Sequence, residues 1–390
     1  MATVLMGWEL GAGLGHIMPL RAVARRLAEH GHRPVFAVRD VFQAAPLLDE
    51  DGFACVPAPP WPALPHRSGA KAITAGMADI LATLGFDDPN RLLANFRAWD
   101  ALIEHIAPKL IVTDYAPGLG LAARPHVPVV ALGNGFALPP DDLEALPALQ
   151  ENVAPMVAQE TILAALNRVQ EVRGRPVLNR LSELFSADAR FVLCLPQLDP
   201  YAQWRRPPAD GPLEPLPKPS PPPAEPRVFA YLGVEFKFFP KVIEGIAASG
   251  MPATIYLRGA DPDLRQRLAR PGLEFTETPP PLADELAECS VAVHYGGLGT
   301  STAGLAAGRP QLVVPRLLER RLQAKALAAA GVAQVLPGRF EARDLTRVLR
   351  DTAGDKAMAA KAAALAEELT GGDRENVLDR IVESCLARLD

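Results

Sequence analysis

The sequence has few cysteines, no excess of basic residues and no long apolar run, and each shortage excludes a class of protein. The four cysteines include no CxxC pair and no Cys/His grouping with zinc-finger spacing, which indicates reduced thiols and no zinc scaffold. A formal net charge of −5 over 390 residues, with a pI near 5.9, argues against a general nucleic-acid-binding protein, because phosphate neutralisation needs a basic excess.

Signals for export and membrane insertion are also missing. No apolar run approaches the ~18 residues that a transmembrane helix needs. The opening stretch, "MATVLMGWELGAG", lacks a basic region and contains Glu9, which is atypical of a signal peptide. We therefore expect a cytoplasmic protein, and its length suffices for two domains.

Proline, by contrast, is abundant, and its uneven placement divides the chain. Residues 207–226, "PPADGPLEPLPKPSPPPAEP", lack too many amide donors to form a helix or a central strand, so this segment is interpreted as an extended linker. The expected organisation is an N-terminal domain over residues 1–206, the linker, a second domain over residues 227–372, and a C-terminal amphipathic helix over residues 373–390.

Short apolar runs alternate with amphipathic helical stretches on both sides of the linker. The runs include "PVFAV", "LIVTD" and "VPVVAL" before it, and "RVFAYLG", "ATIYLRG" and "LEFTET" after it. Continuous apolar strands separated by helices indicate parallel sheets covered on both faces. The fold class predicted is therefore α/β, with two Rossmann-like domains and a cleft between them.

A glycine-rich turn joins a strand to a helix in each half. The first is "GWELGAGLGHIMPL", with Gly11, Gly13 and Gly15, and the second is "HYGGLGTSTAGLAAGRP" at residues 294–310. Backbone amides at such helix N-termini are natural sites for a phosphate or another anion. A glycine turn also serves tight packing, but its recurrence in both halves favours ligand binding.

A dinucleotide site is the main structural alternative for the first turn. "GAGLGH" supplies G-x-G-x-G, but that fingerprint wants its third glycine one place after Gly15, where His16 stands. Asp40, after "VFAVR", has the placement of a ribose-binding acid at the end of the second strand.

With both turns considered, the chain resembles nucleotide-sugar-dependent glycosyltransferases of the GT-B fold, the family that includes sterol and macrolide glycosyltransferases. "HYGGLGTSTAGLAAGRPQLVVP" resembles their donor signature, "GHIMPLRAVARRLAEHGHRPVFAV" their opening, and "PKLIVTDYAPGLGLAARPHVPVVAL" the strand carrying a partner aspartate. The resemblance spans nearly the whole chain and is strongest over residues 286–336. It implies an acceptor-binding N-terminal domain and a donor-binding C-terminal domain.

The resemblance implies a catalytic pair. His16 matches the general base that takes a proton from an acceptor hydroxyl, and Asp114 matches the acid that orients this base. The alternatives are that His16 only caps a helix and that Asp114 only forms a turn.

The resemblance also implies a donor site that needs no metal and no cofactor, the co-substrate being a nucleotide diphosphate sugar, UDP- or dTDP-linked. An acid at the start of a helix binds sugar hydroxyls in the family, and Glu319 occupies that position. The "DPD" of residues 261–263 has the carboxylate spacing of a metal motif, but a loop acid before a helix is the favoured interpretation. The predicted donor-binding residues are Gly13, Gly15, His294, Tyr295, Gly296, Gly297, Gly299, Thr300, Ser301, Glu319 and Arg320.

Two positions depart from the family pattern. Tyr295 stands where the family has a diphosphate-binding histidine, and His294 precedes it, with a side chain expected on the opposite face of the strand. Arg320 stands where a glutamine is common. These departures leave the donor identity open.

The sequence therefore predicts a metal-independent, inverting, hexosyltransferase-like enzyme acting on an unknown small-molecule, lipid or glycan acceptor. A nucleotide-sugar epimerase of the same architecture and a catalytically weak nucleotide-sugar-binding protein remain as alternatives. Trp61, Phe86, Phe96 and Trp99 are candidates for an apolar acceptor pocket, although aromatic residues at such spacing are more often core.

Overall fold

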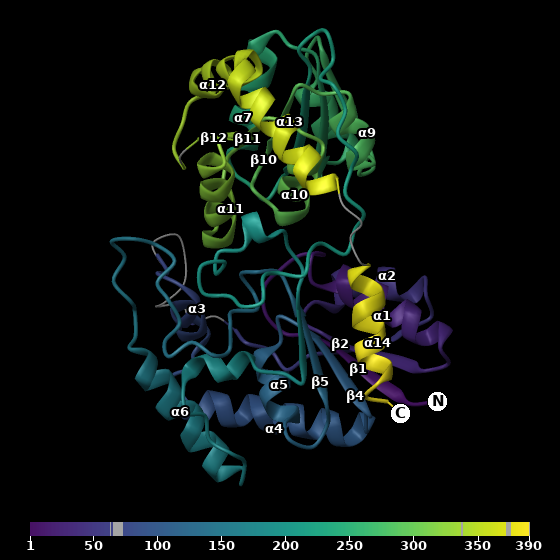
Figure 1. Cartoon of the computed structure of the whole chain (residues 1–390), viewed down its shortest axis with the longest axis vertical. Helices are drawn as coiled ribbons and strands as arrows, with labels where there is room; N and C mark the ends of the chain where they lie inside the picture. The colour runs from purple at the N-terminus through teal and green to yellow at the C-terminus, as the bar shows by residue number, and fades with distance from the viewer. Residues whose placement is uncertain (63, 65–72, 337, 372–375, 390) are drawn as a thin grey trace. The chain divides into compact units, whose positions relative to one another are not determined.

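The computed structural model describes residues 1–62, 64, 73–336, 338–371 and 376–389. The chain forms two compact units (Figure 1): unit 1 combines Met1–Leu213 with Glu375–Asp390, and unit 2 is Glu214–Arg374. Each unit contains one six-stranded sheet flanked by helices. The predicted α/β class with two Rossmann-like units is thus confirmed.

The sheet of unit 1 has the strand order β3-β2-β1-β4-β5-β6, and all of its strand pairs are parallel. This is the doubly wound order, in which ligands bind beyond the carboxyl ends of the strands. Its strands are β1 (Thr3–Trp8), β2 (Arg33–Val38), β3 (Ala54–Pro57), β4 (Leu110–Asp114), β5 (Val129–Gly133) and β6 (Ala189–Val192).

The helices of unit 1 include one contributed by the end of the chain. They are α1 (Ile17–Glu29), α2 (Val41–Asp49), α3 (Met77–Leu84), α4 (Pro89–Ile106), α5 (Pro117–Ala123), α6 (Gln159–Val172) and α14 (Val377–Leu386), with 3-10 turns at Leu181–Phe185 (η1) and Pro196–Leu198 (η2). Helix α14 packs against α1 (Figure 1), burying Val377, Ile381 and Cys385 in the same core as the strands. The amphipathic pattern of the C-terminal segment thus reflects burial against unit 1.

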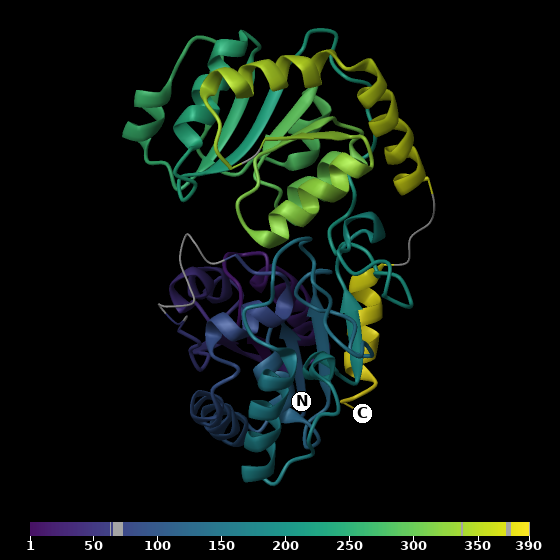
Figure 2. The same ribbon diagram turned by 90° about the vertical axis from the view of Figure 1, so that its left-hand side faces the viewer.

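Unit 2 repeats the architecture, since its order β12-β11-β10-β7-β8-β9 is the same doubly wound arrangement. The strands are β7 (Val228–Gly233), β8 (Ala253–Arg258), β9 (Leu273–Thr276), β10 (Val291–His294), β11 (Gln311–Val313) and β12 (Ala333–Val335). The helices are α7 (Phe239–Ser249), α8 (Pro262–Leu268), α9 (Leu282–Ala287), α10 (Leu298–Ala306), α11 (Leu318–Ala329), α12 (Ala342–Gly354) and α13 (Lys356–Thr370). Figure 2 shows helices on both faces of this sheet.

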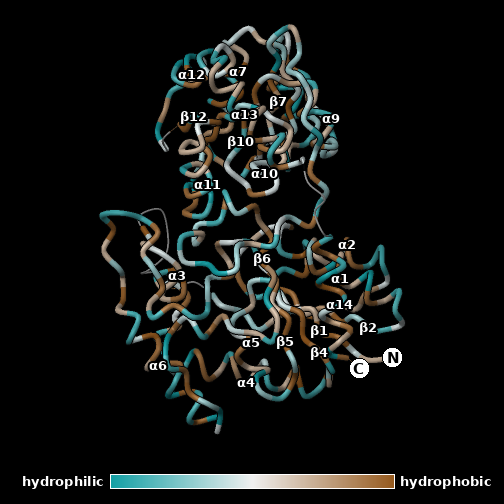
Figure 3. Tube along the Cα trace, viewed as in Figure 1, coloured by the Kyte–Doolittle hydropathy of each residue, from teal (hydrophilic) through white to brown (hydrophobic). Residues whose placement is uncertain are grey.

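Each unit has its core between its sheet and its helices. In unit 1 the central strands β1 and β4 supply fully buried Val4, Met6 and Val112. Figure 3 shows the corresponding hydrophobic colouring of the central strands. Burial on both faces explains why these strands appear in the sequence as continuous apolar runs.

The proline-rich segment, residues 207–226, forms neither helix nor strand, and it is anchored at two places. Asp210 accepts hydrogen bonds from the Val192 amide (2.8 Å) and from Arg380 (2.9 Å), all within unit 1. Buried Arg309 of unit 2 donates to the Ser220 carbonyl (2.8 Å) and hydroxyl (2.6 Å). The segment is therefore held by each unit at one end.

Candidate functional site

The first glycine turn brings His16 and Asp114 together at the carboxyl edge of the unit 1 sheet. Asp114 is the last residue of β4, and it lies in register with Trp8 at the end of the neighbouring β1. His16 stands immediately before α1, and its Nδ1 lies 2.7 Å from Oδ1 of Asp114. The two residues are 98 positions apart in the chain, so this contact is a product of the strand order.

His16 is oriented by Asp114 and packed on three sides. Although it occupies the N-cap position of α1, its side chain makes no capping hydrogen bond, so capping does not account for its placement. Its ring centroid lies 5.9 Å from that of Trp8 and 5.6 Å from that of Tyr115. A Cβ on Gly11 would lie 2.4 Å from Nε2 of His16, and Gly11 has φ +79°, so glycine is required there.

The electrostatic setting of the pair follows from burial. Asp114 is 2% exposed and His16 is 9% exposed. Burial raises the pKa of Asp114 above its ordinary value, and the adjacent His16 opposes that rise. With Nδ1 directed at the carboxylate as a donor, Nε2 is the basic nitrogen of the ring.

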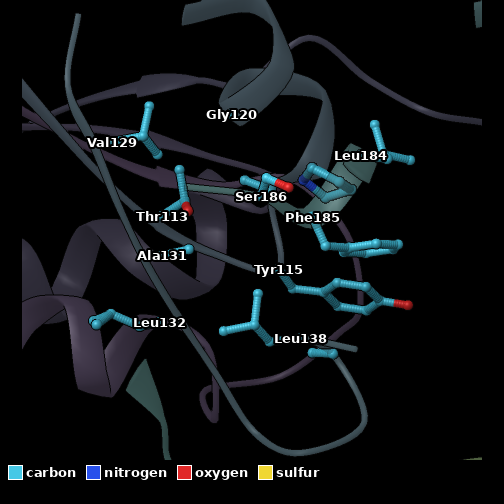
Figure 4. A pocket seen from close by; sticks show the side chains of 13 residues that line it. Thr113, Tyr115, Gly120, Val129, Ala131, Leu132, Leu138, Leu184, Phe185 and Ser186 are labelled. Atoms are coloured by element: carbon cyan, nitrogen blue, oxygen red, sulfur yellow. The ribbon is translucent and has the colours of Figure 1, made fainter. Parts of the chain in front are cut away.

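A small pocket adjoins Asp114 in unit 1 (Figure 4). Residues of β4, α5, β5 and η1 line it, among them Thr113 and Phe185, together with Tyr115 and Leu138 from the segments that follow β4 and β5. Its volume of about 20 Å³ suits about one water molecule. It is therefore too small to hold an organic acceptor.

A buried carboxylate that sequence reasoning did not assign stands at the end of β1. Glu9 follows Trp8 directly, is 1% exposed, and accepts hydrogen bonds from the indoles of Trp61 (2.6 Å) and Trp99 (2.8 Å). It also accepts from the backbone amide of Gly118 at 2.7 Å. The sequence signal was an acidic residue at the end of an apolar strand, in "VLMGWEL".

The second glycine turn leads from β10 into α10 at the carboxyl edge of the unit 2 sheet. Gly296 has φ +79°, and a Cβ there would lie 2.8 Å from the carbonyl oxygen of Arg320, so the turn needs glycine. Added Cβ atoms on Gly297 and Gly299 would meet nothing within 4 Å, and the same holds for Gly13 and Gly15 in the first turn. Both turns therefore leave room for close approach by a ligand.

His294 is enclosed beneath the second turn. It is 1% exposed; its Nδ1 accepts a hydrogen bond from the Gly296 amide (2.9 Å), and its Nε2 lies 2.8 Å from Oε1 of Gln311. An amide N–H can only donate, which makes Nε2 the protonated nitrogen and the ring neutral. Burial lowers the pKa of His294 to about 4, with the nearby charge of Arg320 acting in the same direction.

Tyr295 lies on the opposite face of the strand, as the alternation of side chains predicts. Its ring packs against Phe236 at 4.2 Å between centroids, and its hydroxyl donates to the Gly233 carbonyl at 3.5 Å. It is 5% exposed and belongs to the core cluster that includes Val293. Both ring nitrogens of His294 and the hydroxyl of Tyr295 are thus engaged within unit 2.

The remaining predicted donor residues gather around the same turn. Gly299, Thr300 and Ser301 form the first turn of α10, while Glu319 and Arg320 begin α11. Ser301 is fully buried, and no described residue hydrogen-bonds its hydroxyl. Its side chain therefore points away from the surface of the turn.

Local structure accounts for several other sequence candidates. Asp40 caps α2 by accepting from the Gln43 amide (3.1 Å), and Asp261 caps α8 by accepting from the Leu264 amide (2.7 Å). Within the described residues, no group of three or more His, Cys, Asp or Glu side chains is placed to hold a metal ion. The aromatic candidates Trp61, Phe86, Phe96 and Trp99 are buried, and the rings of Trp61 and Phe86 stack at 4.2 Å.

Comparison with known proteins identifies the fold. Residues 278–383 match the family described as erythromycin biosynthesis protein CIII-like, C-terminal domain. The structure aligns with that of the glycotransferase of kitacinnamycin at a TM-score of 0.71 and 21% identity, covering 100% of this chain and 99% of the other. The chain has the GT-B fold. Glycosyltransferase VinC, solved in complex with DTDP, aligns at a TM-score of 0.64 and 18% identity over 98% of this chain and 100% of its own.

A curated relative matches part of the GT-B chain. Elloramycin glycosyltransferase ElmGT of Streptomyces olivaceus is 40% identical over 116 residues, which are 28% of each of the two chains. The aligned segment thus spans less than a third of that relative. The resemblance to nucleotide-sugar glycosyltransferases expected from the sequence is confirmed by these matches together. No helix among the described residues is long and apolar enough to cross a bilayer.

Proposed function

We propose that this chain is a glycosyltransferase that moves a sugar from a nucleoside diphosphate donor to a hydroxyl group of an organic acceptor. The observation that carries the proposal is the His16–Asp114 contact of 2.7 Å at the carboxyl edge of a doubly wound sheet, beside an open glycine turn. The match of residues 278–383 to the erythromycin biosynthesis protein CIII-like family, and the name of the elloramycin glycosyltransferase relative, support the same reaction class.

The proposed step is a direct displacement. The acceptor oxygen attacks the anomeric carbon while Nε2 of His16 takes the hydroxyl proton, and the bond from that carbon to the phosphate oxygen breaks. The electron pair leaves with the nucleoside diphosphate. Asp114 holds the imidazole in the required tautomer and stabilises the imidazolium that forms. A single displacement inverts the configuration at the anomeric carbon.

The donor side of the proposal rests on unit 2. The diphosphate would lie over Gly297, Gly299 and Thr300, where backbone amides at the start of α10 offset the charge of the leaving group without a metal ion. Arg320 at the start of α11 adds positive charge near this turn, and Glu319 would bind sugar hydroxyls. A uridine or thymidine diphosphate sugar is the proposed donor, and the naming of DTDP in the VinC structure favours thymidine.

The test compares His16→Ala with His30→Ala, an exposed histidine near the other end of the same helix. Each protein is incubated with a panel of nucleoside diphosphate sugars and hydroxyl-bearing acceptors, with and without a chelator. We expect His16→Ala to lose transfer and to keep nucleoside diphosphate affinity, because the base acts on the acceptor. Undiminished turnover in His16→Ala would remove this residue from the mechanism.

The same panel separates the alternative activities. Conversion of the donor sugar to its epimer without an acceptor would support an epimerase, and binding with no turnover would support a nucleotide-sugar-binding protein. Retention of anomeric configuration in the product, read by NMR, would contradict the single displacement.

A further inference from the structure

Glu9 is a buried carboxylate whose hydrogen bonds come from three separate segments. Oε1 accepts from the indoles of Trp61 and Trp99, and Oε2 accepts from the amides of Gly118 (2.7 Å) and Leu119 (3.4 Å) at the start of α5. A Cβ on Gly118 would lie 2.3 Å from Oε1, so this glycine admits the carboxylate to the helix N-terminus.

The donor set defines the ionisation state of Glu9. Indole and backbone N–H groups donate and cannot accept, so a carboxyl proton on Glu9 would face a donor on whichever oxygen carried it. Burial raises the pKa of Glu9, and the four hydrogen bonds oppose that rise. The hydrogen-bond donors therefore favour the carboxylate form, with its charge directed toward the positive end of α5.

The contacts of Glu9 join two segments that follow neighbouring strands: residues 8–16, which end at His16, and residues 114–119, which begin at Asp114. We call these the two strand-end segments. Glu9 lies between Trp8 and Leu10, and Gly118 lies four residues after Asp114. A backbone hydrogen bond also joins the two segments, since the Leu10 amide donates to the Tyr115 carbonyl at 2.9 Å. Glu9 and Leu10 thus hold the end of β1 against the start of α5.

This junction forms the walls around the His16 ring. Trp8 and Tyr115, whose rings flank His16, belong to the two segments that Glu9 joins, and Gly11 packs against Nε2. A shift of either segment would change both the walls of the ring and its approach to Asp114. Because displacements of about 1 Å cost about 100-fold in rate, such a shift matters for proton transfer.

We propose that Glu9 is a positioning residue for the His16–Asp114 pair: its carboxylate joins the two strand-end segments and so fixes the geometry of the proton acceptor. This inference rests on the proposed function. In the proposed reaction Glu9 contacts no substrate, and it acts through Trp8, Leu10 and Gly118.

The test is Glu9→Gln in the full chain, with Asp79→Asn as a matched control. Asp79 is also 1% exposed and accepts from two backbone amides, those of Ala75 (2.6 Å) and Met156 (2.7 Å), but it has no bond to either strand-end segment. In Glu9→Gln the side-chain NH₂ must face either the two indoles or the two amides, so one pair of bonds is lost. We expect kcat to fall about 10- to 100-fold, with the donor KM and nucleoside diphosphate affinity unchanged.

Rescue and a spectroscopic readout separate positioning from simple destabilisation. Adding Trp61→Phe and Trp99→Phe to Glu9→Gln removes the donors that oppose the new NH₂, and we expect kcat to recover in part. The ring ¹⁵N shifts of His16, assigned by their loss in His16→Ala, should show a single tautomer in the wild type and Asp79→Asn, and a mixture in Glu9→Gln. An unchanged tautomer and kcat in Glu9→Gln would overturn the inference, whereas absence of transfer by the wild type would overturn the proposed function alone.

Discussion

Acidification provides a quantitative test of the buried histidine of unit 2. His294 is the only one of the seven histidines in the sequence that falls within residues 214–374. Its two ring nitrogens are engaged by Gly296 and Gln311, and it is held neutral. In the unfolded chain it takes up a proton near pH 6.5, whereas burial lowers its pKa in the folded chain to about 4.

The sign and size of the effect follow from linkage. Between these two pKa values the unfolded chain binds more protons, so the contribution of His294 to stability is complete above pH 6.5 and is lost as the pH falls toward 4. The full difference corresponds to about 3 kcal/mol, of which about 2 kcal/mol is lost by about pH 5. Comparison with a variant is necessary because carboxylates titrate in the same range.

The measurement is urea unfolding of wild type and His294→Asn at about pH 7.5 and about pH 5. Oδ1 of asparagine can accept from the Gly296 amide in place of Nδ1, but the side chain does not titrate. We expect wild type to lose about 2 kcal/mol more than the variant on acidification, and His105→Asn, at an exposed histidine in α4, to behave as wild type. Equal losses in wild type and His294→Asn would refute the neutral, buried assignment.

Two further predictions concern the catalytic pair and the linker. Asp114→Asn should lower kcat by at least about tenfold, but by less than His16→Ala, and should leave the donor KM unchanged. The substitution removes orientation and charge stabilisation but not the proton acceptor. Steady-state kinetics equal to those of wild type would make Asp114 a structural residue. Arg309→Met should speed amide hydrogen exchange at Ser220 at least about tenfold, because the bonds that anchor this residue to unit 2 are lost. Unchanged exchange at Ser220 would show that other contacts hold the segment.

The sheets could be predicted from the sequence because their strands are buried on both faces. The run "LIVTD" predicts a strand that ends at Asp114, and β4 spans Leu110–Asp114. "VAVHYGG" likewise predicts β10 and the turn after it, observed as Val291–His294 followed by Gly296 with positive φ. In these segments local hydrophobicity and turn chemistry agree with the tertiary fold.

The hydrogen-bond partners of buried polar groups could not be predicted in the same way. Glu9 bonds residues 52, 90 and 109 positions away, and no local pattern specifies which distant N–H groups will satisfy a buried carboxylate. Similarly, the amphipathic pattern of the C-terminal helix predicts a buried face but does not say that α1 covers it. Side-chain alternation did separate His294 from Tyr295, yet the bond to Gln311 required the neighbouring strand β11.

The two histidines at the two glycine turns show how burial and partner decide what an imidazole can do. His16 retains 9% exposure and faces a carboxylate, which stabilises the imidazolium, so the ring can accept a proton and return it. His294 is 1% exposed and faces the amide oxygen of Gln311 and a backbone N–H. The bond to Gln311 favours a protonated ring, but the cost of burying the positive charge outweighs it. Its neutral ring therefore stabilises the turn through hydrogen bonds to Gly296 and Gln311. By strand order His294, at the end of β10, corresponds to Asp114 at the end of β4, whereas His16 follows β1. We therefore expect the proposed acid–base chemistry in unit 1, and ligand binding through the backbone of the turn in unit 2.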